Sequence, residues 1–200
     1  MKYARALLGF ASALLLLSGC SEKGSLEENT IKTADMSKRE KAVIGQASEF
    51  YFLYNFAVDE TFDSLSIWVE SYENGKKSEA VYGPVTTELQ GKDGYIFFSK
   101  NKEPEQAEES LFNLGMGDEG GDSSAHYTAD AAKVDFAHMK QDFAEEGISI
   151  EGKNILGVYA STEDNSLTSI SLDMERDAEE QLEGLEGYES VYVFMAEFKK

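Results

Sequence analysis

The chain has 200 residues, a formal net charge of −20 at pH 7, 42% hydrophobic residues and a single cysteine. This hydrophobic fraction excludes an intrinsically disordered chain, and 17 glycines and 2 prolines exclude a collagen-like or low-complexity polymer. The length predicts one packed domain with a sizeable core. One cysteine excludes an intrachain disulfide and a cysteine-clustered zinc site. The negative charge argues against nucleic acid as a partner.

The N-terminus has the organisation of a secretory signal peptide. Lys2 and Arg5 supply a positive start, and residues 6–17 are apolar apart from Gly9 and Ser12. Twelve helical residues reach about 18 Å, which is short of the roughly 30 Å of a bilayer core. The sequence therefore predicts a cleaved signal and not a spanning helix.

The signal closes with Leu17-Ser18-Gly19-Cys20. Here the chain resembles bacterial lipoproteins, whose lipobox is a leucine, two small residues and a cysteine. The resemblance implies cleavage between Gly19 and Cys20 and a diacylglyceryl group on the Cys20 sulfur. Two or more acyl chains give stable membrane anchoring. We therefore expect a lipid-anchored protein on a bacterial cell membrane, facing outside the cytoplasm.

The charge changes little on cleavage. Removal of residues 1–19 takes away two of the 18 basic side chains and none of the 38 acidic ones, so the net charge becomes about −22. We expect repulsion to keep the folded part off anionic lipid head groups.

Three regions are predicted along the chain: a signal peptide at 1–19, a lipidated N-terminus with a flexible tether at 20–40, and a folded domain at 41–200. Residues 21–40 are polar and mixed in charge, which is typical of a tether. An alternative is a short helix over 35–46, where Ser37 and Glu40 would form a capping box.

Alternating apolar residues then predict strands. The first starts at Ser48, with Phe50, Phe52, Tyr54, Phe56 and Val58 on one face. Residues 65–73 repeat the alternation, and Asn74-Gly75 predicts a type I′ hairpin with residues 76–82. Gly83-Pro84 is expected to end that strand.

Further strands follow. Residues 85–90 and 95–100 flank the turn sequence GKDG and predict a second hairpin. Residues 110–116 fit a strand. NILGVYAS and SLTSISL around TEDN predict another hairpin, and residues 189–198 a last strand.

One helix is predicted in the middle of the chain. Ala132, Phe136, Met139 and Phe143 recur at helical spacing, with Gly147 as a stop. A weaker helix or acidic loop is expected over 175–186. Together the elements predict an antiparallel β-sandwich, immunoglobulin-like in architecture, with one or two short helical insertions.

The folded region resembles uncharacterised surface lipoproteins of Gram-positive bacteria that carry β-sandwich domains. The resemblance rests on WVESYENGKK (residues 68–77), on the NILGVYAS to SISL segment and on the aromatic last strand that ends in Glu197-Phe198. It implies a fold and no activity.

The sequence holds no recognisable catalytic motif. The two histidines, His126 and His138, lack the HExxH spacing, and no GxSxG, GxGxxG or Walker pattern is present. His138 would lie one helical turn from Asp142 and near Asp135. A small hydrolase or metal-dependent enzyme that uses His126 or His138 is an alternative function.

Two acidic segments are candidate sites. Asp118, Glu119 and Asp122 lie in a glycine-rich loop that could wrap Ca²⁺, which makes a calcium-stabilised structural domain another alternative; no other cofactor is expected. An ordinary acidic loop has the same composition. The second segment offers a face for a basic partner or a solvated surface, and its acids are Asp173, Glu175, Asp177, Glu179, Glu180, Glu183 and Glu186.

Aromatic side chains could also form a binding platform. Tyr51, Trp68 and Tyr72 point away from the expected core face, although core packing under a covering loop is the competing interpretation. The leading hypothesis is a non-catalytic surface module that binds a protein, a peptide or a cell-wall component.

Overall fold

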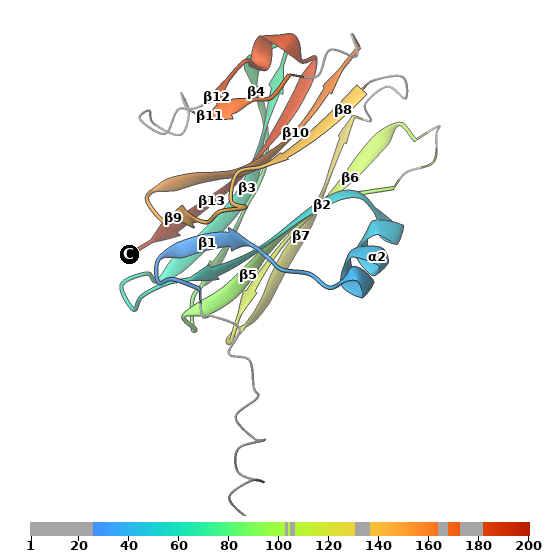
Figure 1. Ribbon diagram of the computed structural model, residues 1–200. Helices are drawn as coiled ribbons and strands as arrows, with labels where there is room; N and C mark the ends of the chain where they lie inside the picture. Colours follow the sequence, from blue (N-terminus) through green and yellow to red (C-terminus); the bar gives the residue numbers. More distant parts are fainter. Residues whose placement is uncertain (1–25, 103, 105–106, 131–136, 164–167, 173–181) are drawn as a thin grey trace, which may run out of the picture.

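The computed structural model describes residues 26–102, 104, 107–130, 137–163, 168–172 and 182–200 (Figure 1). All strand pairs in the described part are antiparallel, and they form two main sheets and a two-stranded one. The first sheet has the order β7 (Gly121–Asp130), β6 (Glu109–Asp118), β5 (Asp93–Asn101), β2 (Ser48–Ala57), β1 (Thr30–Thr33), β9 (Ile148–Ser149). The second has the order β4 (Lys76–Glu88), β3 (Ser64–Glu73), β13 (Ser190–Lys199), β10 (Lys153–Thr162), β8 (Ala137–Asp142). The small sheet pairs β11 (Ser171–Leu172) with β12 (Leu182–Glu183).

The main core lies between the two large sheets. The alternation in β2 buries Phe50, Phe52, Tyr54 and Phe56. From the opposite sheet, Phe194 packs with its ring centroid 5.1 Å from that of Phe52. Such aromatic pairs add to the free energy gained from burial. The predicted antiparallel β-sandwich is therefore confirmed.

A second apolar cluster covers the outer face of the five-stranded sheet. Trp68 and Tyr72 are only 8% and 7% exposed there, because they belong to a cluster with Ile170, Leu185 and Tyr188 from the chain around β11, β12 and the 3-10 turn Leu185–Gly187. Glu70 accepts hydrogen bonds from Trp68 Nε1 and Tyr72 Oη. These two aromatic residues are core residues and do not form an exposed platform.

The hairpin predicted at Asn74-Gly75 is confirmed. Both residues have positive φ, 49° and 76°, as a type I′ turn requires. The expected strand end at Gly83-Pro84 is wrong. β4 runs on to Glu88, because a register irregularity in its pairing with β3 accommodates the Gly83-Pro84 step.

The two other predicted hairpins are wrong. β5 pairs with β2 and β6, while residues 85–88 stay paired with β3, so the GKDG segment connects the two sheets. β10 pairs with β8 and β13, and β11 pairs with β12. Turn residues identified the chain reversals, but long-range pairing decided the partners.

The predicted helix is also wrong for its described part, because residues 137–142 form strand β8. Met139 and Phe143 are four residues apart, a spacing that one face of a helix and one face of a strand share. Pairing with β10 along its whole length selects the strand. Ala132 and Phe136 lie outside the described residues.

The expected tether contains folded structure. Ile31 of β1 is fully buried, and residues 38–47 form helix α2 (Lys38–Ala47). The capping box is present, since Ser37 Oγ accepts from Glu40 N and Glu40 Oε2 accepts from Ser37 N. The helix alternative describes this segment, and the folded region includes residues 30–40.

Candidate functional site

The sandwich has an opening along one side, between β2 and β8. The part of β2 that pairs with β1 is limited to residues 54–57. After Thr33 the chain leaves the sheet and forms α2. Among the described strands, the N-terminal half of β2 is therefore paired on one side only. β8 is the edge strand of the facing sheet. We call this region the β2–β8 opening.

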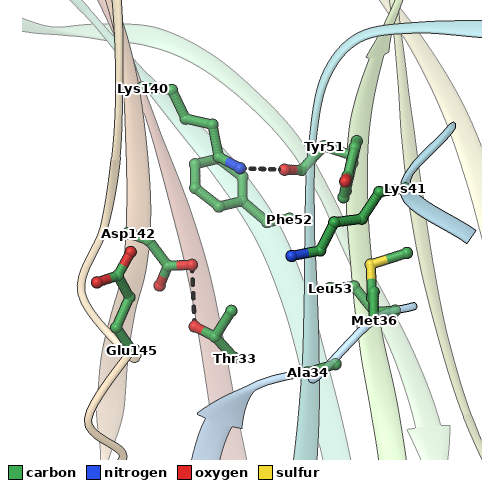
Figure 2. Close-up of a pocket in the computed structure, with 10 residues that line it drawn as sticks. All are labelled: Thr33, Ala34, Met36, Lys41, Tyr51, Phe52, Leu53, Lys140, Asp142 and Glu145. Carbon is green, nitrogen blue, oxygen red and sulfur yellow. Dashed lines mark hydrogen bonds between the residues drawn. The ribbon is translucent and has the colours of Figure 1, made fainter. Parts of the chain in front are cut away.

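A pocket of about 310 Å³ lies in the opening (Figure 2). Three separate parts of the chain supply its walls: β2, the segment from β1 into α2, and the segment from β8 to Glu145. Figure 2 shows Lys41 and Lys140 directed into it from opposite sides. Its lining residues are Thr33, Ala34, Met36, Lys41, Tyr51, Phe52, Leu53, Lys140, Asp142 and Glu145.

Lys140 crosses the opening. Its Nζ donates to the main-chain oxygen of Tyr51 and lies 4.4 Å from the ring centroid of Phe52. The side chain stays open to solvent, but loss of hydration beside these rings lowers its pKa, although Asp142 and Glu145 act in the opposite direction. The ammonium is thus fixed at the pocket wall.

Asp142 anchors the other end of the pocket. Its Oδ2 accepts from Thr33 Oγ1 at 2.9 Å, and its Oδ1 accepts from Ala144 N at 3.0 Å. Figure 2 shows the Glu145 carboxylate beside it. The pocket therefore carries two ammonium groups and two carboxylates around aromatic and apolar walls.

A second polar cluster lies next to this pocket, at the start of β2. Glu49 pairs with Lys100 and accepts a hydrogen bond from Tyr159. Partial burial raises the pKa of Glu49, but these two donors outweigh it, so the pKa is lowered overall. His138 stacks on Tyr159, with ring centroids 5.4 Å apart, and loss of hydration lowers its pKa.

The two histidines lie on different sheets. His126 on β7 is exposed and contacts Asn113 Oδ1 through its Nδ1 at 2.7 Å, whereas His138 is on β8. Ser161 pairs with His138 in register, but its buried Oγ makes no hydrogen bond within the described part of the chain. The two histidines therefore do not share one site, and an enzyme that uses His126 or His138 stays a prediction.

The candidate calcium residues have structural contacts at the β6–β7 turn. Asp118 accepts from the main-chain N–H groups of Gln90, Gly91 and Gly120, and Asp122 accepts from Tyr95 Oη at 2.9 Å. Glu119 lies in the turn between the strands. Among the described residues, no three His, Cys, Asp or Glu side chains group as metal ligands. Calcium binding stays a prediction.

The remaining candidate residues fall mainly outside the described residues. Gly19 and Cys20 do so, as do Asp173, Glu175, Asp177, Glu179 and Glu180. Of the acidic segment, Glu183 is in β12 and Glu186 is exposed in the 3-10 turn. In the described part of the chain, no helix is long and apolar enough to cross a membrane.

In a comparison with known families, residues 30–198 match the YgaN domain. This chain belongs to the YgaN-domain family. The matched region runs from the first residue of β1 to the penultimate residue of β13, so both sheets and the opening are inside it. No curated protein and no solved structure matches the chain.

Sequence reasoning missed the pocket of this YgaN domain; among the lining residues it considered only Tyr51 and Asp142 for a functional role. One local signal was available: His138, Lys140 and Asp142 alternate with less polar residues, as a strand with one polar face requires. The apolar spacing around them suggested a helix instead. Lys41 and Thr33 come from segments about 100 residues away, so no local pattern could place them beside β8.

Proposed function

We propose that this YgaN-domain protein is a lipid-anchored, extracytoplasmic, non-catalytic module that binds a peptide, a protein or a cell-wall component in the β2–β8 opening. The signal sequence and the lipobox residues 17–20 support the anchoring part of the proposal. The pocket supports the binding part.

One observation carries the binding proposal: a pocket with walls from three segments, in which charged side chains from two of them face a common space beside an incompletely paired strand. Binding sites are typically concave, with apolar walls and a few placed polar groups. Phe52 and Leu53 supply such walls, and Lys41, Lys140 and Asp142 supply polar groups. The region lies entirely in the family-matched part of the chain.

The binding proposal is tested with an obstructed pocket. Ala34 lines the pocket, and its N–H bonds to Leu53 O at 2.8 Å, so Ala34→Trp adds bulk there while it keeps the main-chain contact. Val81→Trp is the control, because Val81 is 46% exposed on β4. The chain from Ser21 onward, immobilised, is mixed with solubilised wall fragments and extracellular proteins of its own organism.

We expect the native chain and Val81→Trp to retain the same component and Ala34→Trp to lose it. Repeating the retention experiment at high salt measures how strongly the interaction depends on charge. Equal retention by all three chains would contradict binding in the opening.

The anchoring proposal is tested separately with Cys20→Ala in cells. We expect the native protein in the membrane fraction with an acylated N-terminal peptide by mass spectrometry, and Cys20→Ala uncleaved or released. Unchanged membrane association and an unmodified N-terminal peptide in the native protein would contradict lipidation.

A further inference from the structure

The β2–β8 pocket carries charges of both signs. In Figure 2 Lys140, Asp142 and Glu145 enter it from the β8 side, with the two carboxylates together below Lys140, and Lys41 enters from the opposite side. The pocket thus offers two ammonium groups and two carboxylates to one ligand. A ligand with a single charge could pair with the two lysines or with the two carboxylates, but not with both.

Lys140 and Asp142 have hydrogen-bonding positions left for a ligand. An ammonium has three N–H donors, and the structure shows one of those of Lys140 donating to Tyr51 O. A carboxylate has about four acceptor positions, and Asp142 uses one on each oxygen for Thr33 and Ala144 and also interacts with the Tyr54 hydroxyl. Contacts already made hold these groups in place, so a ligand meets a partly preorganised site.

The pocket is small. Its volume of about 310 Å³ is at the lower end of the range of roughly 300–1,000 Å³ for small-molecule sites. Met36, Phe52 and Leu53 offer apolar surface for a small aliphatic group between the charged side chains.

We propose that the pocket binds a small zwitterion of the α-amino acid or dipeptide class with both ends unblocked. Lys41 and Lys140 would face the carboxylate, and Asp142 and Glu145 the ammonium group. The inference rests on the proposed function and adds the chemical class of the ligand to it.

The test uses alanyl-alanine as the probe and the chain from Ser21 onward, labelled with ¹³C at the methionine methyl groups. Met36 lines the pocket, whereas Met116 and Met195 are buried in the two core clusters and serve as internal controls. The spectrum of Met36→Leu assigns the reporter signal. We expect alanyl-alanine to shift the Met36 methyl signal in a saturable way and to leave the Met116 and Met195 signals unchanged.

Blocked dipeptides test the need for both charges. N-acetylalanyl-alanine and alanyl-alaninamide each remove one end charge, and we expect each to raise the Kd about ten-fold or more. Lys41→Met and Glu145→Gln are expected to raise the Kd for alanyl-alanine by a similar factor. Lys38→Met and Glu146→Gln, exposed neighbours that do not line the pocket, are controls expected to bind as the native chain does.

Three results would overturn the inference: no Met36 shift with alanyl-alanine, equal affinity for the blocked dipeptides, or equal affinity after Lys41→Met and Glu145→Gln. The proposed function fails in a different way. If Ala34→Trp still abolishes retention of an envelope component while alanyl-alanine does not bind, the opening is a binding site for another class of ligand. If Ala34→Trp has no effect, binding in the opening is itself wrong.

Discussion

Lys140 on β8 donates through its Nζ to the main-chain oxygen of Tyr51 on β2. This bond joins the two sheets across the side where they are open. The ammonium also lies over the ring of Phe52. One side chain therefore forms part of the pocket wall and connects the sheets.

The packing and the charge of Lys140 can be separated by two substitutions. Lys140→Met keeps an unbranched side chain over Phe52 and removes the ammonium, and we expect the free energy of unfolding to change by less than about 1 kcal/mol. Lys140→Ala removes the stem as well and should cost about 1–2 kcal/mol. Urea unfolding measures both values. A loss of more than about 3 kcal/mol for Lys140→Met would show that the charge itself holds the sheets.

The Glu49–Lys100 pair predicts an asymmetry between its two partners. The Lys100 side chain is 8% exposed and that of Glu49 34%. Glu49→Gln removes the carboxylate that pairs with the buried Lys100 ammonium, and we expect a loss of about 2–3 kcal/mol. Lys100→Met removes the buried charge and should cost clearly less. If urea unfolding finds Lys100→Met the more destabilising of the two, the desolvation argument fails.

The stability should depend on pH through His138. Loss of hydration lowers its folded-state pKa below the ordinary value of 6.5; of the facing groups, Glu49 opposes this shift and Lys100 reinforces it. The unfolded chain therefore binds a proton first, and stability present above pH 6.5 is lost as the pH falls toward the folded pKa. The loss should stay below about 1 kcal/mol because the ring is solvent-exposed.

Glu49 contributes to the pH dependence of stability in a lower pH range. Its pKa is lowered from 4.5, so its contribution is present above that pH and is lost as the pH falls through the folded value. Urea unfolding between pH 8 and pH 3 checks both effects. His138→Gln should flatten the curve near pH 6 and leave the acidic limb, whereas an unchanged curve would show that His138 does not contribute.

Gly157 on β10 is required for the packing behind the pocket. A Cβ there would lie 2.7 Å from Phe52 Cε1 and 3.0 Å from Gln141 O of β8. We expect Gly157→Ala to cost about 2 kcal/mol through overpacking. Gly45→Ala in α2 is the control, since nothing lies within 4 Å of its added Cβ, and it should stabilise by about 0.5–1 kcal/mol. Thermal or urea unfolding would contradict this account if the two substitutions had equal effects.

Strand positions could be predicted from the sequence because alternation is a local property. The run from Phe50 to Phe56 buries every second side chain on one face, and Asn74-Gly75 has the two positive φ values of its turn type. Strand partners could not be predicted in this way. Val85 pairs with Ile67 and not with the strand that follows GKDG, and only packing across the whole chain decides this.

The candidate site depends on such long-range placement. Thr33 meets Asp142, and Tyr51 meets Lys140, over separations of 109 and 89 residues. Thr33 and Lys140 belong to no sequence motif, and the sequence pattern assigns Tyr51 and Asp142 to other candidate sites. The acids that do form a local pattern, Asp118 and Asp122, accept hydrogen bonds at the β6–β7 turn.

The central claim, that the β2–β8 opening is the ligand site, can be measured by thiol protection. The only cysteine of the chain is Cys20, so the chain from Ser21 onward has none, and Ala34→Cys and Val81→Cys each introduce a single thiol. The rate of maleimide modification is measured with and without solubilised wall fragments and extracellular proteins. We predict that this mixture slows modification at position 34 at least about five-fold and leaves position 81 unchanged. Equal rates at position 34 with and without the mixture would contradict the claim.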